Sequence, residues 1–595
     1  MELTNNIEND KDSSNNNNNT LNIEAKYDIE NNDNTNKKKH TRHRSTTQQS
    51  STSNKTDNTI EALELPNDKL EKDDHSSISN ENTIETESIA NYSKLIKLKY
   101  WWWDKGISSL IFIFHILLNI GLVIKIIFHF RKSEFYPFFG ISLLTARAGA
   151  AIININSALI LLPVLRNFLS WLRGTWISTY VPIDRNLSYH KLCAIGITLE
   201  QYGLSAEYVS KYYLYYKSVP GITGHVLIVV LLLICSSSVE RIRRPMFEIF
   251  YVTHHLFIAY FILLCFHGYQ QILKVAPNSY MWVGAPVLFY VVERAIRLIR
   301  GNREVMLHLA KQHPSKVLEL RMKKGNFIYK PGQFIFLNCP SIANYEWHPF
   351  TITSAPDENY ISVHINIVGN WTGKLYKLMN SNEKLGVVQN EVLTGPDGGP
   401  ILKIDGPFGA ASEDVFNYKV LVLVGAGIGA TPYSSILKHI KYQLKRLMSE
   451  QSEQGKEWNL PIEKVYFFWI SRDKNSFEWF TYILHDVESE LNDLVEIHTY
   501  LTGAIEISDW NAIVDTIGTM DTEQHSDFIT GLKSQTLFGR PNWDVVFQEL
   551  TKIHKKNTIG VFYCGPRPLA KEIKNRCSQY NGMEGCHIIF HKENF

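Results

Sequence analysis

The chain has 595 residues, more than one hydrophobic core usually organises, so its length predicts several domains. Lys and Arg number 61 against 59 Asp and Glu, and this near-neutral balance gives no support for nucleic acid or another polyanion as a partner. The seven Cys form no CxxC pair and no metal-ligand spacing, which predicts reduced thiols rather than a disulfide framework.

Residues 1–95 differ in composition from the rest of the chain. Asn, Ser, Thr, Asp and Lys dominate, with a run of Asn at 15–19 and a basic cluster at 37–40. Such a segment buries too little apolar surface to offset its ordering entropy, so we expect a disordered tail. It shows neither the apolar core of a signal peptide nor an EF-hand loop. The basic cluster is read as either a solvated stretch or a docking segment for anionic lipid or a partner.

Five long apolar runs follow within about 200 residues, at 107–130, 140–165, 221–239, 246–266 and 280–299. Each approaches the ~20 residues that a helix needs to cross a bilayer. Globular proteins rarely contain five such runs in so short a stretch. The pattern therefore predicts a polytopic α-helical membrane domain.

Basic residues indicate the orientation of this domain. They follow three of the runs, at Arg166, Arg173 and Arg185, at Arg241, Arg243 and Arg244, and at Arg294, Arg297, Arg300 and Arg303. By the positive-inside rule these places are cytosolic. A cytosolic N-terminus then requires an even number of crossings, and the sixth must lie between His190 and Val219. That window carries Glu200, Glu207 and Lys211, each of which costs roughly 2.5–3.5 kcal/mol at mid-bilayer on insertion scales.

Histidines in the apolar runs are candidate haem ligands, because bis-histidine haem requires neutral imidazoles from facing helices of a bundle. His254 and His267 lie near opposite ends of one run. Their separation of thirteen residues spans about 20 Å of helix, enough for one haem at each level of the membrane. The same spacing rotates an ideal helix by about 220°, so a shared face would require a distorted helix.

From Val305 the pattern changes to short runs broken by Gly and Pro, which is typical of antiparallel β structure. The strings that carry this pattern are 329–337, 348–354, 361–368, 371–373 and 405–409. By themselves they predict a β domain and no particular ligand.

A buried-strand run at 420–424 leads directly into a Gly-Ala-Gly-Ile-Gly turn and a helical stretch. This order places bare backbone N–H groups and the positive end of a helix dipole where a pyrophosphate binds. Arg472 follows a second buried strand, at 465–470, where an α/β domain could hold a nucleotide phosphate; an ordinary surface Arg is the alternative. A third strand, 561–564, ends in a Gly-Pro turn at the same predicted crevice.

These segments together resemble the NADPH oxidase family, and most of all its phagocyte flavocytochrome b, over nearly everything after residue 100. The strings that carry the resemblance in the membrane half are 145–147, 159–163, 166–167, 172–174, 184–185 and 253–256. Those in the second half are 348–356, 423–432, 477–480, 539–543 and 592–595. The ordered set is highly specific, although each string alone could arise by chance.

The resemblance implies a polytopic α-helical membrane haem domain of about six spans, an antiparallel β-barrel FAD domain and an α/β nucleotide-binding domain. We place the tail at 1–95, the haem domain at 96–302, the FAD domain at 303–417 and the NADPH domain at 418–595. The cofactors implied are FAD, two haems b and NADPH.

The resemblance also implies roles for particular residues. His190 and His254 would ligate the inner haem, and His267 one side of the outer haem. FAD would be held by His348, Pro349, Phe350, Thr351, Ile352, Thr353 and Ser354, with Trp371 and Thr372 nearby. The NADPH pyrophosphate would lie on Gly425, Gly427, Gly429, Thr431 and Pro432, its 2′-phosphate on Arg472 and Arg540, and its nicotinamide beside Cys564, Gly565 and Pro566. Phe595 would cover the flavin, and Arg147 would lie near the oxygen-reducing site unless it forms a structural interhelical pair.

One departure from the family concerns the outer haem. A second His is expected fourteen residues after His190, but that position is Leu204, and no His occurs between 191 and 224. This is also the window in which the sixth crossing becomes polar. We hypothesise that a segment is missing or altered here, with His225 as a possible substitute ligand for the partner of His267.

Three functions remain open from the sequence: a superoxide-forming oxidase, a ferric reductase of the same architecture, or a regulatory form that lacks the outer haem. The terminal Glu-Asn-Phe string and the 539–543 string favour the oxidase. The family further implies oxygen and membrane lipid as partners, together with cytosolic activators that include a small GTPase, and a small membrane companion subunit. It implies an integral protein of the plasma, endosomal or phagosomal membrane with both termini in the cytosol.

Overall fold

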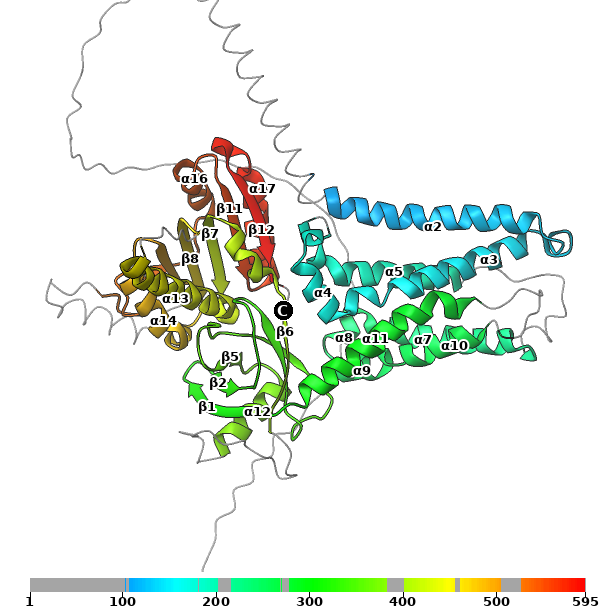
Figure 1. Cartoon of the computed structure of the whole chain (residues 1–595), viewed down its shortest axis with the longest axis horizontal. Coiled ribbons are helices and arrows are strands. Elements are labelled where there is room, and N and C mark those ends of the chain that lie inside the picture. Colours follow the sequence, from blue (N-terminus) through cyan, green and yellow to red (C-terminus); the bar gives the residue numbers. More distant parts are fainter. Residues whose placement is uncertain are drawn as a thin grey trace, which may run out of the picture. The chain divides into compact units, whose positions relative to one another are not determined.

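A computed structural model describes Trp102 and residues 106–179, 181–201, 216–267, 269, 278–381, 401–454, 461–503 and 526–593 (Figure 1). The predicted tail at 1–95, Leu204 with the polar part of the predicted sixth crossing, and Phe595 lie outside these residues. All seven cysteines are free thiols, as the sequence predicts.

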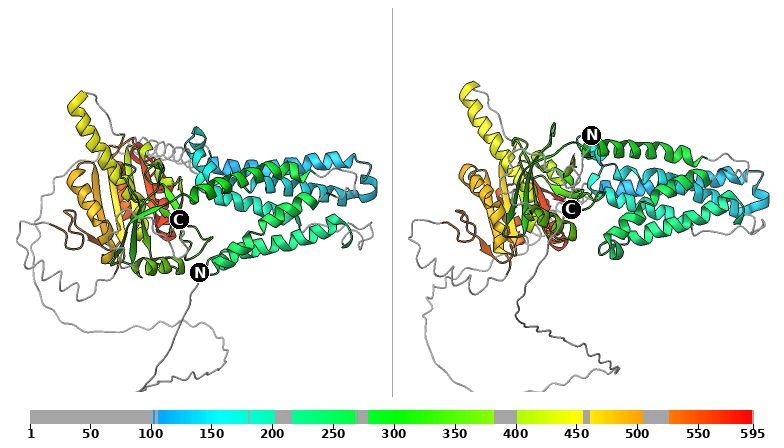
Figure 2. Two further views of the ribbon diagram at one scale, coloured as in Figure 1. Left: turned by 60° about the horizontal axis from the view of Figure 1, so that its bottom comes forward. Right: turned by 90° about the horizontal axis from the view of Figure 1, so that it is seen from below.

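The first half is helical. Its longer helices are α2 (Ile107–Arg131), α3 (Tyr136–Leu159), α4 (Arg166–Arg173), α5 (Asn186–Gln201), α7 (Val219–Ser238), α9 (Phe247–His254), α10 (Phe257–His267) and α11 (Ser279–Gly301). Helix α3 contacts α2, α5 and α11, and α7 contacts α9 and α10. These helices run alongside one another in the two further views of Figure 2.

Four segments of the described chain are long and apolar enough to cross a membrane: Ser109–Arg131, Tyr136–Val164, Val219–Ser238 and Phe247–His267. Their outer faces carry large exposed apolar side chains, such as Phe114 at 66% and Phe128 at 65% on α2, and these suit a lipid environment. Helix α11 is also long, but its second half carries Glu293 and several Arg. Crossings by α5 and α11, and hence a total of six, stay predictions.

The fourth of these segments is broken. Helix α9 ends at His254 and α10 begins at Phe257, with a turn at His255 and Leu256 between them. The thirteen residues from His254 to His267 therefore do not form one regular helix, so the ideal rotation of about 220° does not apply to them.

The next part is built from two three-stranded antiparallel sheets, with strand orders β1-β2-β5 and β4-β3-β6. The strands are β1 (Met306–His313), β2 (Val317–Lys323), β3 (Phe334–Asn338), β4 (His348–Thr351), β5 (Ile361–Asn366) and β6 (Lys403–Phe408). Trp371 and Thr372, which were expected within this β pattern, instead lie in the first turn of helix α12 (Asn370–Ser381). Trp371 is buried there against the sheet core, and this burial makes the helix amphipathic.

The last part is a six-stranded parallel sheet of order β10-β9-β8-β7-β11-β12 (Figure 1). Its strands are β7 (Val420–Ala426), β8 (Lys464–Ser471), β9 (Val495–Leu501), β10 (Leu537–Phe538), β11 (Thr558–Cys564) and β12 (His587–Lys592). The helices are α13 (Thr431–Gln454), α14 (Glu478–Glu490), α16 (Trp543–Ile553) and α17 (Arg567–Tyr580).

Both faces of this parallel sheet are buried, which explains the continuous apolar run of β7. Leu421 and Leu423 join the cluster that holds residues of α13 and α14. Val422 and Val424, on the opposite face, join the cluster that holds residues of α16 and α17. After β7, the strands β8, β9 and β10 lie on one side of it in the sheet, whereas β11 and β12 lie on the other side. The strand order therefore reverses between β7 and β11, which is a topological switch point.

The C-terminal turns of α11 are fixed to strand β6 by a buried carboxylate. Asp405, whose side chain is 2% exposed, accepts hydrogen bonds from Arg297 Nε at 2.7 Å and from Arg300 Nε at 2.8 Å. Lys324 Nζ donates to the backbone oxygens of Arg300 and Ile404. We call Arg297, Arg300, Lys324 and Asp405 the α11 anchor, because it joins the last helix of the bundle to the antiparallel part.

Replacing Asp405 by Asn should destabilise the protein by about 3 kcal/mol, because two half-buried guanidinium groups lose the negative charge that balances them. Thermal unfolding of the purified full chain, followed by flavin fluorescence, measures this effect. The matched control is Glu463→Gln, which removes an exposed carboxylate from an ion pair with Lys419 and should cost at most about 1 kcal/mol. Equal shifts for the two variants would contradict a structural role for the anchor.

Candidate cofactor sites

His190 and His254, which were predicted as the two ligands of one haem, face one another in the bundle. They come from α5 and from the last residue of α9, and their ring centroids lie 6.3 Å apart with an interplanar angle of 54°. An imidazole nitrogen binds a metal at about 2.0–2.1 Å, so two nitrogens on one ion lie about 4 Å apart. The rest of the 6.3 Å between the centroids is the distance from each ring centroid to its own nitrogen, counted once for each ring. The pair therefore fits a single bis-histidine iron.

Hydrogen bonds orient these two rings. His190 Nδ1 lies 2.9 Å from the backbone oxygen of Ile160, and only a protonated Nδ1 can donate to that acceptor. The lone pair of His190 is then on Nε2, which is the tautomer that a metal ligand requires. His254 Nδ1 lies 3.4 Å from the hydroxyl of Ser238 at the end of α7.

His267 lies at a second level of the bundle. Its Nδ1 is 2.9 Å from the hydroxyl of Thr223, which donates its own proton to the backbone oxygen of Val219. Thr223 therefore accepts from Nδ1, and Nε2 of His267 carries the lone pair. Thr223 and Ser238 are fifteen residues apart on α7, or about 22 Å along the helix axis. The two levels are thus separated as a haem pair requires.

Other histidines of the helical half make different contacts. His115 Nδ1 lies 3.0 Å from the hydroxyl of Tyr189, and His255 Nδ1 lies 2.7 Å from the backbone oxygen of Tyr251. His225, the suggested substitute ligand for the outer haem, is exposed and its ring stacks on Tyr216 at 5.8 Å. These contacts give no support for His225 as the partner of His267.

Arg147 is half-buried on α3, and its guanidinium lies 5.1 Å from the ring centroid of Phe130, near the end of α2. It therefore lies close to the α2–α3 connection. The contact is a cation–π pair within the bundle. A role at an oxygen-reducing site stays a prediction.

The predicted FAD strap, residues 348–354, begins as strand β4 and continues along a buried path. Thr353 N donates to the oxygen of Ser362 at 2.8 Å, and the Ser354 hydroxyl lies 2.8 Å from that of Tyr329. The backbone oxygens of Thr353 and Ser354 accept from Ser434 and Ser435 of α13. The strap is thus hydrogen-bonded to the antiparallel part on one side and to helix α13 on the other.

Three aromatic side chains meet beside the strap. The ring centroids of His348 and Trp371 are 4.2 Å apart, and those of Phe350 and Trp371 are 6.1 Å apart. His348 and Phe350 share one side of β4, while Pro349 is exposed on the other and Thr351 is buried there. Trp371 Nε1 is buried without a hydrogen-bond partner in the described chain. An unsatisfied donor beside an aromatic surface fits an isoalloxazine or adenine ring, so these residues suit FAD.

The glycine turn lies at the carboxyl end of β7. Gly427 has a φ of +58° and open space where a Cβ would lie, so its backbone can approach a ligand. A Cβ on Gly429 would lie 2.2 Å from the backbone oxygen of Cys564, and only glycine allows this approach. Helix α13 starts at Thr431, followed by Pro432, and presents its N-terminal N–H groups to the same crevice.

The Cys-Gly-Pro turn lies across the switch point from the glycine turn. Cys564 is paired with Gly425 in the β7–β11 register, and the Tyr563 hydroxyl closes the turn by donating to the oxygen of Pro566 at 2.8 Å. Gly565 adopts a φ of +153°, and burial raises the pKa of the Cys564 thiol. The predicted pyrophosphate and nicotinamide residues therefore come together in one crevice.

Arg472 and Arg540 are exposed beyond the carboxyl ends of β8 and β10. One strand separates these ends, so they lie about 10 Å apart on the same edge of the sheet. Two exposed guanidinium groups on that edge are compatible with a phosphate, and binding of the 2′-phosphate stays a prediction.

Glu593 belongs to the terminal Glu-Asn-Phe string, and its carboxyl is buried, which the string did not indicate. Its N–H donates to the oxygen of Tyr563 at 2.9 Å, and its Oε1 accepts from Ser412 N at 2.5 Å. Burial raises its pKa to about 7, against the lowering effects of Ser412 and of Arg173. Glu593 thus connects the end of β11 to the antiparallel part, two residues before Phe595.

The raised pKa of Glu593 predicts a pH-dependent stability. The unfolded carboxyl releases its proton near pH 4.5 and the folded one near 7, so its stabilising contribution is present below pH 4.5 and is lost as the pH rises to 7. Glu593→Gln keeps an acceptor oxygen without titrating. Its stability relative to the unmodified chain should therefore rise between pH 5 and 8, by at most about 3 kcal/mol. A difference that does not change with pH, measured by thermal unfolding alongside Glu463→Gln, would contradict this assignment.

Three protein-family models match the chain. A ferric reductase like transmembrane component matches residues 149–265, an FAD-binding domain matches 303–412, and a ferric reductase NAD binding domain matches 418–578. These matches agree with the helical, antiparallel and parallel parts of the fold.

Curated relatives match over most of the chain. One superoxide-generating NADPH oxidase heavy chain of Dictyostelium discoideum is 49% identical over 538 residues, which cover 84% of this chain and 75% of the relative. A second such heavy chain of the same organism is 44% identical, covering 84% and 99%. NADPH oxidase 1 of Mus musculus is 35% identical, covering 83% and 95%. This chain belongs to the NADPH oxidase family.

Proposed function

We propose that this chain is a superoxide-generating NADPH oxidase that moves electrons from NADPH through FAD and haem across a membrane to molecular oxygen. The observation that carries the proposal is the facing pair of His190 and His254, in a chain whose other half has an FAD strap and a pyrophosphate crevice. When bound, FAD accepts hydride and releases single electrons, and haem conducts them. The protein supplies binding, orientation and exclusion of water.

At the nucleotide end, the N–H groups of the glycine turn and α13 hold the pyrophosphate, and Arg472 and Arg540 hold the 2′-phosphate. The Cys564–Pro566 turn then positions the nicotinamide. Phe595, two residues after the buried Glu593, would cover the flavin site when nicotinamide is absent. The hydrogen bond from Glu593 N–H to the oxygen of Tyr563, one residue before Cys564, supports a position of the C-terminus near the predicted nicotinamide site.

At the membrane end, His190 and His254 hold the inner haem, and His267 supplies one ligand of the outer haem. The second ligand falls in the family pattern at Leu204, which lies outside the described residues. We retain the hypothesis that the functional transcript carries a longer third crossing with another His. Arg147 lies at the outer level in this scheme.

The finer setting is also proposed. The basic residues after the apolar runs support cytosolic termini, in the plasma membrane or an endosomal or phagosomal membrane. The Dictyostelium relatives are named heavy chain subunits, which supports a smaller companion chain here. Cytosolic activators, including a small GTPase, complete the proposed assembly.

Superoxide production tests the function directly. Membranes from expressing cells, supplied with cytosol, FAD and NADPH, should reduce cytochrome c in a reaction that superoxide dismutase abolishes. His254→Leu, which removes one of the two facing imidazoles, should eliminate the signal. The family models carry ferric reductase names, and reduction that persists with superoxide dismutase would favour that activity instead.

We expect a preference for NADPH over NADH, because charge-assisted contacts to the 2′-phosphate are worth about 1.5–3 kcal/mol, or roughly ten- to a hundredfold. Arg540→Ala should reduce the ratio of kcat/KM for NADPH to kcat/KM for NADH, mainly because the value for NADPH falls. Arg576→Ala, on the surface of α17 where it pairs with Asp544, is the matched control. Equal efficiency with both nucleotides in the unmodified chain would rule out the assignment.

A further inference from the structure

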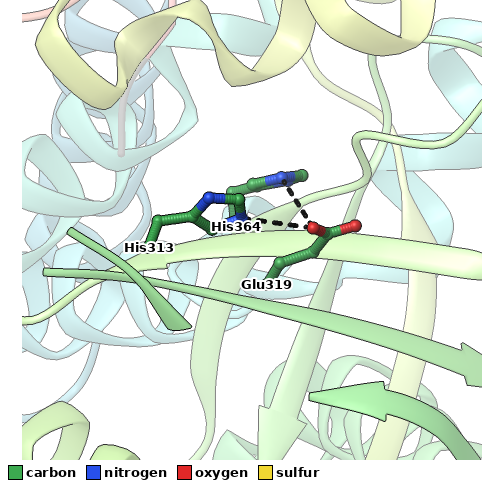
Figure 3. Close-up of side chains that lie close together, drawn as sticks. All are labelled: His313, Glu319 and His364. Atoms are coloured by element: carbon green, nitrogen blue, oxygen red, sulfur yellow. Dashed lines mark hydrogen bonds and ion pairs between the residues drawn. The ribbon is translucent and has the colours of Figure 1, made fainter. Parts of the chain in front are cut away.

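Three chemically active side chains converge in the β1-β2-β5 sheet, next to the FAD strap. His313 ends β1, Glu319 lies in β2 and His364 lies in β5, and Figure 3 shows them pointing toward one another. Their side chains are only 2%, 2% and 1% exposed. We call these three residues the His-Glu-His cluster.

The ligand atoms of the cluster lie within metal-binding range. Glu319 Oε2 is 3.2 Å from His313 Nε2 and 3.9 Å from His364 Nε2, and all three atoms lie within 4.8 Å of one another. Two ligands of a tetrahedral zinc ion lie about 3.4 Å apart, given bonds of about 2.0–2.2 Å. The observed distances bracket that value.

The hydrogen bonds of His364 leave its other nitrogen unsatisfied. Nδ1 lies 2.9 Å from the hydroxyl of Thr353, whereas Nε2 is buried without a hydrogen-bond partner in the described chain. The 3.9 Å from Nε2 to Glu319 is too long for a hydrogen bond. A buried nitrogen aimed at a carboxylate oxygen across that distance is satisfied by a cation between the two atoms.

We propose that His313 Nε2, Glu319 Oε2 and His364 Nε2 bind a zinc ion. Two imidazoles and one carboxylate form an established ligand set for zinc, with a fourth position left for water. Zinc is favoured over redox-active metals because its filled d shell imposes no geometry of its own, and the distances from Glu319 Oε2 to the two histidine nitrogens are unequal.

Neighbouring groups orient Glu319 and His364, as the partners of metal ligands commonly do. Arg321 Nε donates to Glu319 Oε1 at 2.6 Å, and the Thr353 hydroxyl holds Nδ1 of His364. Glu319 Oε2 is hydrogen-bonded to His313 Nε2 at 3.2 Å, and a metal ion bound by both atoms would replace that bond. Glu478 Oε1 lies 3.8 Å from His313 Nδ1 and adds a second negative charge beside the ion.

The site would join three strands to the FAD strap. Thr353 belongs to the strap, and the ring of His364 packs on Trp479 of α14 at 4.8 Å. A zinc ion here would therefore stabilise the contact between the antiparallel part and the parallel sheet. This role is independent of electron transfer and does not rest on the proposed function.

Zinc analysis of the full chain tests the proposal. The chain, purified in detergent with flavin and haem and without a histidine tag, is incubated with Zn²⁺, desalted, and measured by plasma mass spectrometry. We expect about one zinc ion retained per chain. X-ray absorption at the zinc edge should show imidazole nitrogen ligands at about 2.0–2.1 Å.

His364→Gln and Glu319→Gln should each lower zinc affinity by at least about tenfold, while flavin and haem content remain unchanged. The matched control is His498→Gln, which removes a histidine that contacts Glu496 on β9 and should leave zinc binding intact. A chain that retains no zinc after incubation would overturn the proposal. Zinc content that is the same in the two cluster variants as in the unmodified chain would overturn it too, by assigning the ion to another site. If the cluster variants lose flavin, X-ray absorption of the unmodified chain decides, and a zinc spectrum without imidazole nitrogen ligands would overturn the proposal.

Discussion

The connection between α11 and strand β6 is the constraint on which the arrangement of the molecule depends. Asp405 is nearly inaccessible to water, and its two oxygens accept from Arg297 and Arg300 one turn apart on α11. A buried carboxylate with two fixed guanidinium partners permits little rotation of the helix about its axis. The bundle that carries the facing histidines is thereby tied to the sheet beside the FAD strap.

The second connection runs through the C-terminal segment. Glu593 is bonded to Tyr563 at the end of β11 and to Ser412 near the antiparallel part, and Arg173 of α4 pairs with Asp414 at 2.9 Å. Residues from all three parts of the chain therefore meet near the predicted flavin and nicotinamide positions. Electron transfer needs cofactors at short, fixed separations, and ionic contacts between the parts serve that need.

Local patterns predicted much of this fold. The run at 420–424 and its glycines indicated a parallel strand and a phosphate turn because those features depend on neighbouring residues only. The sequence indicated that a distorted helix would be needed between His254 and His267, but not where the break lies. The helical position of Trp371 and the His-Glu-His cluster were not foreseen. Each depends on contacts between residues distant in sequence, and His313, Glu319 and His364 come together only through the pairing of β1, β2 and β5.

Transfer of electrons from NADPH to the haem that His190 and His254 are proposed to bind is central to the proposed function. Anaerobic addition of NADPH to the purified full chain, followed by optical spectroscopy, tests it most directly. We expect flavin absorbance to fall and the bands of reduced bis-histidine haem then to rise. Reduction of the flavin with a haem that remains fully oxidised would contradict the proposed path.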